Sequence, residues 1–102
     1  MKGDFADQRL DRLDTDAGFD AGYPPAVVSA FRRRMQQIRS APDERVFSAL
    51  KSLHVETLKG PPSGERSLRL NDQWRLIVEI TGTGEEQAIV VLRIEDDHSG
   101  GA

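Results

Sequence analysis

Cysteine is absent from this chain of 102 residues. Without cysteine, neither a disulfide framework nor a thiolate metal site can form. Long apolar runs are missing as well, because the longest, from Ala88 to Leu92, is far shorter than the roughly 20 residues that a membrane-spanning helix requires. The N-terminus also lacks the basic and then apolar segment of a secretion signal. We therefore expect a cytoplasmic protein that does not enter a membrane.

An excess of basic residues, the usual mark of a nucleic-acid-binding domain, is missing too. The formal net charge is -3. The acidic residues are concentrated at the two ends, since residues 1–20 and 95–102 together carry a charge of -6, whereas residues 21–94 carry +3. A local basic surface in the middle of the chain therefore remains compatible with a nucleic-acid partner.

The chain has the size and composition of one folded domain. Its 102 residues are enough for one hydrophobic core and too few for two. With 37% hydrophobic and 30% charged residues, the composition is that of an ordinary soluble protein. We expect a single domain that spans residues 1–102.

The first half of the sequence has the spacing of helices. Residues 1–5 could form a short strand, and apolar residues recur at helical intervals over 6–17 and 26–40. Pro24 and Pro25 suit the start of the second helix, where a missing N–H costs nothing. The arginines of this helix lie away from its apolar stripe and are interpreted as a solvent-exposed face, with a phosphate-binding or partner-binding face as the alternative.

A shorter helix is expected next. Ser40 and Asp43 have the spacing of a capping box, and Pro42 ends any continuation of the preceding helix. The apolar residues that follow predict a helix over 43–51. His54 has no second His or Cys near it in sequence, which favours an ordinary imidazole over a metal ligand.

The second half alternates as strands do. Apolar and polar residues alternate over 67–71 and 74–80, and the tight Asn-Asp-Gln connection between them predicts a hairpin. A third strand over 87–95 is apolar on both faces, as expected near the middle of a sheet. Helices followed by hairpin-connected strands indicate an α+β fold, in which a small antiparallel β-sheet is packed on one face by N-terminal helices.

Two arginines fall on one side of the predicted hairpin. If its leucines and Trp74 face the helices, Arg69 and Arg75 lie together on the open face of the sheet. Two guanidinium groups on an uncovered face form the outline of an anion site. The alternative is that each arginine pairs with a carboxylate, for which Glu79 on the same face is the nearest candidate.

The third strand ends in Asp96, Asp97 and His98. Consecutive residues on a strand point to opposite sides, so at most Asp96 and His98 converge, which argues against a metal site. An Asp–His pair suits general acid–base chemistry better. The alternative is an acidic chain end without a catalytic role.

Three segments taken together resemble those of a known family. The segments LKG at 58–60, SLRLNDQWR at 67–75 and IEDDH at 94–98, which follow two helices, are similar to those of the HigB-like toxins of the RelE/ParE superfamily, also called plasmid maintenance killer proteins. The likeness covers nearly the whole chain. It implies a RelE-like fold and a type II toxin that cleaves messenger RNA on the ribosome without a metal or other cofactor. It also implies a cognate antitoxin, which we expect to be a helix-turn-helix protein.

The resemblance assigns roles to individual residues. The catalytic residues that it implies are Lys59, Arg69, Arg75, Asp96 and His98. Asp96 and His98 would transfer protons, whereas the three cations would stabilise the charge that builds on the phosphate. Arg66 stands where the family often has an aromatic residue, and we expect it to bind RNA together with Arg69 and Arg75.

Two other functions remain open, and one of them follows from a departure from the family pattern. Asp97 stands between Asp96 and His98, where the family pattern has a tyrosine. A toxin weakened by this change could serve as an antitoxin-binding module. The second alternative is a ParE-type inhibitor of DNA gyrase, against which the presence of Lys59, Asp96 and His98 argues.

Overall fold

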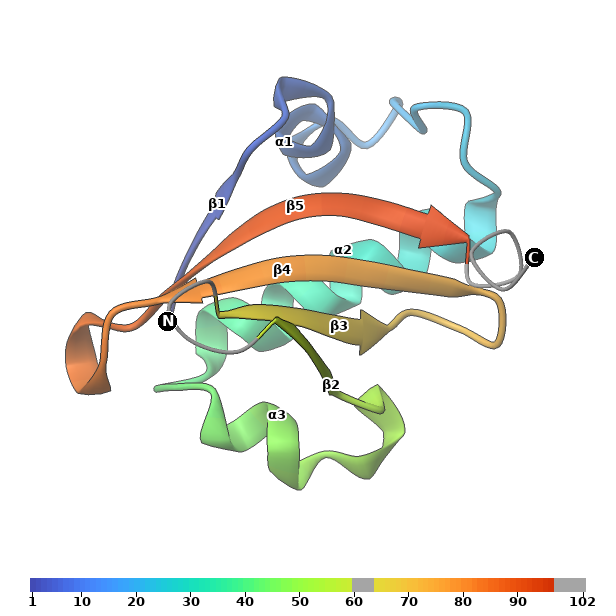
Figure 1. The fold of residues 1–102 in the computed structure, drawn as a ribbon. Coiled ribbons are helices and arrows are strands. Elements are labelled where there is room, and N and C mark those ends of the chain that lie inside the picture. The colour runs from blue at the N-terminus through green and yellow to red at the C-terminus, as the bar shows by residue number, and fades with distance from the viewer. Residues whose placement is uncertain (60–63, 97–102) are drawn as a thin grey trace.

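A computed structural model describes residues 1–59 and 64–96 of the chain (Figure 1). The strands are β1 (Lys2–Phe5), β2 (Glu56–Lys59), β3 (Glu65–Arg69), β4 (Trp74–Thr81) and β5 (Ala88–Asp96). The helices are α1 (Gln8–Thr15), α2 (Pro25–Ser40) and α3 (Arg45–Ala49), with short 3-10 turns at Lys51–Leu53 and Gly84–Glu86. Within these described ranges, no helix has both the length and the apolar character needed to cross a membrane.

The strands form one sheet in the order β1-β5-β4-β3-β2. All neighbouring strands are antiparallel except β1, which runs parallel to β5 at one edge of the sheet. The predicted α+β fold with helices on one face of a small sheet is confirmed. The parallel edge strand is an addition that the sequence pattern does not reveal.

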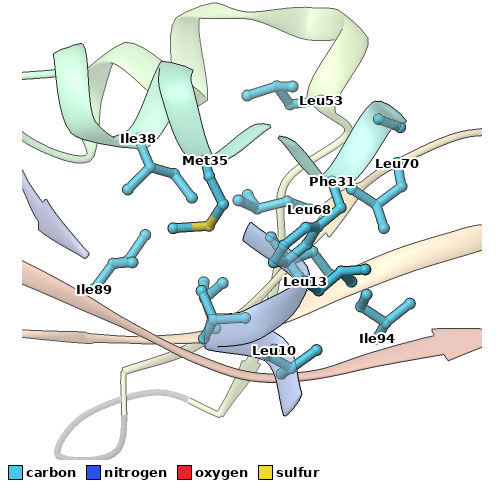
Figure 2. Close-up of a cluster of buried hydrophobic side chains, with 14 of the residues drawn as sticks. Leu10, Leu13, Phe31, Met35, Ile38, Leu53, Leu68, Leu70, Ile89 and Ile94 are labelled. Atoms are coloured by element: carbon cyan, nitrogen blue, oxygen red, sulfur yellow. The ribbon is translucent and has the colours of Figure 1, made fainter. Parts of the chain in front are cut away.

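Helix α2 crosses behind β3, β4 and β5, and no described helix lies in front of these strands (Figure 1). Its residues Phe31, Met35 and Ile38 are fully buried and meet the apolar residues of the sheet in one core (Figure 2). The uncovered side of these three strands is called the open face below. By strand alternation it carries Glu65, Ser67 and Arg69 on β3, Arg75, Ile77 and Glu79 on β4, and Arg93 and Glu95 on β5.

The predicted elements agree with the structure over most of the chain. The first two predicted helices appear as α1 and α2, the later strands as β3, β4 and β5, and the short start as β1. Strand β5 lies between β1 and β4, which is the position near the middle of the sheet that its apolar residues predict. The sequence does not predict β2, because its four residues Glu56–Lys59 include one large apolar side chain and so show no alternation.

The predicted capping box at Ser40 is wrong. Ser40 is the last residue of α2, and its hydroxyl donates to the carbonyl of Gln37 at 3.1 Å. The residue before a proline avoids the helical region, so Pro42 makes Ala41 extended (ψ 136°) and lets α2 run as far as Ser40. Helix α3 begins later, at Arg45, whose backbone N–H donates to the carboxylate of Asp43 at 2.9 Å.

Arg32 of α2 joins this helix to α1 through hydrogen bonds. Its Nε donates to the carbonyl of Leu13 at 3.1 Å, and its Nη2 donates to the carbonyls of Asp16 and Phe19 at 3.0 and 3.3 Å. These carbonyls at and beyond the end of α1 have no partner within that helix. The interpretation as a solvent-exposed face holds for Arg33, which is exposed, but not for Arg32.

Candidate functional site

The β3–β4 hairpin brings Arg69 and Arg75 together, as predicted. The two residues are direct partners in the register of these strands. Strand β5 extends the pair, because Glu95 is the partner of Arg75 on its other side. Neighbouring strands lie about 5 Å apart. Arg69, Arg75 and Glu95 therefore form a row across the open face, which is called the open-face row below.

Arg69 is held by the hairpin turn and by α2. Its guanidinium forms an ion pair with Asp72, and its Nε donates to the carbonyl of Asn71 at 3.3 Å. On the other side, Nε of Arg34 donates to the carbonyl of Arg69 at 3.0 Å. Burial, together with the charge of Arg33, lowers the pKa of Arg34, which nevertheless remains a cation at neutral pH. The predicted ion-pair alternative thus holds for Arg69, with Asp72 in place of Glu79.

Arg75 donates to neutral groups. Its Nε binds the hydroxyl of Ser67, and its Nη2 binds the carbonyls of His54 and Ser67. An ion pair with Glu79 is not formed, since Glu79 lies opposite Glu65 in the strand register. Within residues 1–59 and 64–96, no carboxylate forms an ion pair with the guanidinium of Arg75. Its positive charge is therefore not neutralised there, which suits the binding of an anion.

His54 supports Arg75 through its backbone. Its φ of 44° lies in the left-handed region, and this conformation ends the 3-10 turn at Lys51–Leu53. The imidazole is exposed and lines a cavity of about 730 Å³ between α3 and the strands β2 and β3. Sequence reasoning weighs the imidazole of His54 as a metal ligand and does not predict the role of its backbone carbonyl. The direction of this carbonyl depends on the backbone conformation, which the type of the residue does not reveal.

Arg66 is separated from the other two arginines of the predicted RNA-binding set. It alternates with Ser67, so its side chain points to the helix side of β3, and its Nη2 lies 3.8 Å from the carboxylate of Glu44. Arg66 also lines the cavity beside α3. The structure therefore does not bring Arg66 together with Arg69 and Arg75.

Asp96 lies at the same end of the sheet as the open-face row, but it points to the other face. Its partner in the register is Trp74, on the helix side of β4. Its Oδ2 accepts a hydrogen bond from Nε2 of Gln73 at 2.9 Å. Asp97 and His98, predicted to continue this part of the site, lie outside the described residues.

Lys59 belongs to β2, where its backbone partner is Glu65. Glu65 begins β3 and Arg69 ends it. Four residues along a strand span about 13 Å. The register therefore places the backbone of Lys59 at the opposite end of β3 from the two arginines.

Arg93, a further cation on the open face, bridges the carboxylates of Glu95 and Glu65. Sequence reasoning does not propose a role for any of these three residues. Its Nε lies 2.5 Å from Oε1 of Glu95, and its Nη2 lies 3.4 Å from Oε1 of Glu65. The hydrogen bond to Glu95 raises the pKa of Arg93. Because it joins β5 to β3, the side chain of Arg93 crosses β4, where Ile77 on the same face is 2% exposed.

The side chains at this end of the sheet offer hydrogen-bond donors and carboxylates. Within the described ranges, no three His, Asp or Glu residues are grouped closely enough to hold a metal ion. Guanidinium groups bind phosphate through charge-assisted hydrogen bonds, and a carboxylate can accept a proton. The open-face row can therefore hold a phosphodiester next to a proton acceptor.

Solved structures share this fold over nearly the whole chain. A YoeB/ParE toxin from Agrobacterium tumefaciens has a TM-score of 0.59 and 20% sequence identity, and the match covers 94% of this chain and 98% of that chain. A mutant of YafQ from E. coli has a TM-score of 0.54 and 12% identity, with 99% of this chain and 98% of that chain covered. At these identities the likeness establishes the fold, which agrees with the predicted RelE-like architecture.

Sequence comparison adds nothing to this result. No protein-family model matches the chain, and no curated protein sequence matches it. The narrower resemblance to HigB-like toxins therefore stays a prediction.

Proposed function

We propose that this chain is the toxin of a type II toxin–antitoxin system and that it cleaves messenger RNA on the ribosome. The observation that carries the proposal is the pair Arg69 and Arg75, side by side on the uncovered face of the sheet. The fold supports it, because the chain shares that fold with the YoeB/ParE toxin and with YafQ. A HigB-like cytoplasmic toxin is the form that the sequence resemblance favours.

The proposed reaction needs groups of three kinds. Cleavage of RNA without a metal activates the ribose 2′-hydroxyl against the adjacent phosphate, which requires a base, an acid for the departing 5′-oxygen and cations for the phosphate charge. Arg69 and Arg75 are the proposed cations, with Lys59 as a third. Asp96 and His98, from the end of β5 onwards, are the proposed proton-transfer groups.

The contacts of the two arginines suit them to this role. Arg75 is bonded to a hydroxyl and to carbonyls, so its charge is available to a phosphate. Arg69 pairs with Asp72, whose side chain is 96% exposed. Exposed ion pairs of this kind contribute about 0–1 kcal/mol, so a phosphate can replace the carboxylate at little cost.

The proposal includes partners. We expect a cognate antitoxin, of the helix-turn-helix class, to bind the chain and silence it. The ribosome would present the message to the open face, which removes the need for a large basic surface on the chain itself.

Arg75→Ala tests the proposed function. After brief induction in growing bacteria, the parent protein should truncate messages and arrest growth. Loss of a cation that stabilises the phosphate charge should lower message cleavage about a hundredfold or more. The measurement is the mapping of new message ends.

Arg45→Ala is the matched control. Arg45 on α3 is 88% exposed and pairs with Asp43, away from the open face. Its loss should leave cleavage unchanged. Growth arrest with intact messages in the parent would contradict the nuclease and favour inhibition of DNA gyrase, and equal losses in both variants would contradict the assignment of the site.

A further inference from the structure

Strand β5 ends in two carboxylates that point to opposite faces of the sheet. Glu95 is the partner of Arg75 and belongs to the open-face row, whereas Asp96 is the partner of Trp74 on the helix side. A base that takes the proton of the ribose 2′-hydroxyl must reach the same substrate as the cations that hold its phosphate. Of these two carboxylates, Glu95 is the one that shares a face with the arginines.

We propose that Glu95 is the general base of the site and that Arg93 positions it. The inference rests on the proposed function and deepens it, because it moves the role of the base from Asp96 to Glu95, a residue that the family resemblance does not point to. In this assignment Asp96 lies behind the reacting groups, where it is bonded to Gln73.

The carboxylate of Glu95 is open to a substrate. Its side chain is 48% exposed. Within the described ranges, its carboxylate accepts a side-chain hydrogen bond from Arg93 alone. A carboxylate has about four lone-pair positions, so most of them remain for a hydroxyl of the substrate.

The spacing within the row fits one phosphodiester. The side chain of Arg75 runs from β4 towards Ser67 and His54, which is the direction away from Glu95. The backbones of β4 and β5 are about 5 Å apart. Because the side chain of Arg75 leads away from β5, the gap between its guanidinium and the carboxylate of Glu95 is wider than this distance. A ribose 2′-oxygen beside Glu95 and phosphate oxygens beside Arg75 can occupy this gap together.

The reaction step balances with these groups. Glu95 takes the proton of the 2′-hydroxyl while the bond from the 2′-oxygen to phosphorus forms and the bond from phosphorus to the 5′-oxygen breaks. The departing 5′-oxygen takes a proton from water, and protonated Glu95 then gives its proton to the hydroxide that remains. The products are a 2′,3′-cyclic phosphate and a 5′-hydroxyl.

Arg93 fixes the direction of Glu95. Its Nε holds one carboxylate oxygen, and its Nη2 is anchored on Glu65, which is 7% exposed. An exposed side chain held in this way loses less rotamer freedom when substrate binds. Arg93 is a positioning residue, since its donors are directed at carboxylates of the chain.

Glu95→Gln tests the assignment of the base. The amide keeps the size of the side chain but cannot take a proton at neutral pH, so message cleavage after induction should fall about a hundredfold or more. Binding of a fluorescent 2′-O-methyl RNA hexamer, measured by anisotropy, should stay equal or become tighter, because a negative charge beside the phosphate is removed. Glu95→Asp should retain part of the activity.

The matched control is Glu79→Gln. Glu79 also lies on the open face of β4, four residues beyond Arg75, and it belongs to neither the proposed base nor the phosphate site. Its cleavage should equal that of the parent. Cleavage by the parent and equally by Glu95→Gln would overturn the inference alone, as would a large loss in Asp96→Asn without one in Glu95→Gln. Absence of cleavage by the parent would overturn the proposed function and this inference with it.

Arg93→Met separates positioning from a structural effect. If Arg93 acts through Glu95, its loss should lower cleavage several-fold in the parent but have no further effect in a chain that already carries Glu95→Gln. Equal fold losses in both backgrounds would show that Arg93 acts independently of Glu95. Thermal unfolding of each variant verifies that the fold is kept.

Discussion

At the scale of single residues, the conformation of one backbone unit helps to hold the side chain of Arg75. His54 has a φ of 44°, and its carbonyl accepts a hydrogen bond from Nη2 of Arg75. Residues other than glycine are strained in this region, and those with a branched β-carbon are strained most. The guanidinium therefore depends on a conformation that most side chains disfavour.

His54→Val should lower the free energy of unfolding by about 1–2 kcal/mol, because a β-branched residue resists the left-handed region. His54→Gly should cost much less, since glycine adopts this region freely. Urea denaturation of the two variants measures the difference. Equal stabilities would contradict the claim that the backbone conformation is what matters at this position.

At the scale of secondary structure, the junction of α1 and α2 depends on one side chain. Arg32 donates to three carbonyls, one at the end of α1 and two in the segment that follows. Hydrogen bonds from a charged group contribute about 1.5–3 kcal/mol, and carbonyls left without donors add a cost. The packing of α1 against α2 is therefore held by polar contacts as well as by Leu10 and Leu13.

Arg32→Met should lower the free energy of unfolding by about 1–3 kcal/mol, with the loss of order beginning at α1. Arg33→Met is the control, because the neighbouring Arg33 is exposed and should be replaceable without measurable cost. Urea denaturation gives the size of the effect, and amide hydrogen exchange gives its location. Similar losses in both variants would contradict the role given to the three carbonyls.

The sequence pattern predicts the hairpin half of the site better than the β5 half. Arg69 and Arg75 flank a tight connection, which fixes the register and hence their shared face. In β5 an irregularity intervenes, since Ile77 pairs with Arg93 but Val78 pairs with Val91, which leaves Leu92 without a partner. This bulge shifts the alternation by one residue, so apolar runs on both faces do not reveal on which side Glu95 and Asp96 lie.

The alternation of apolar and polar residues in the sequence does not indicate how the short edge strand β2 pairs. The segment of β2 shows no alternation, so its pairing with β3 follows from the tertiary structure. Arg66 belongs to the same strand as Arg69 but has the opposite orientation, which alternation does predict once the strand is known to begin at Glu65. The sequence thus indicates the elements and their faces, whereas edges and bulges come from packing.

At the scale of the whole molecule, the proposed RNA contact is small and the net charge is unfavourable. The chain carries a charge of -3, and the open-face row provides two arginines. Each phosphate contact on a single strand contributes about -0.7 to the slope of log affinity against log salt. Affinity for RNA alone should therefore be weak and only moderately sensitive to salt.

Two contacts give a slope of about -1.4, so raising the salt from about 50 to about 200 mM should weaken binding of the 2′-O-methyl hexamer about sevenfold. Anisotropy titrations at several salt concentrations measure the slope. Arg75→Ala should reduce it by about half. A slope steeper than about -3 would mean that a larger basic surface than the open-face row takes part.

The parallel pairing of β1 with β5 joins segments from the beginning and the end of the described chain, with Lys2 opposite Ala88. Contacts between residues so far apart in sequence form late in folding. During synthesis β1 has no partner until β5 has been made, and the open-face row is incomplete until Glu95 has been added. If the chain acts on translation as proposed, its reacting groups come together only after synthesis has passed Glu95 and β5 has paired with β4.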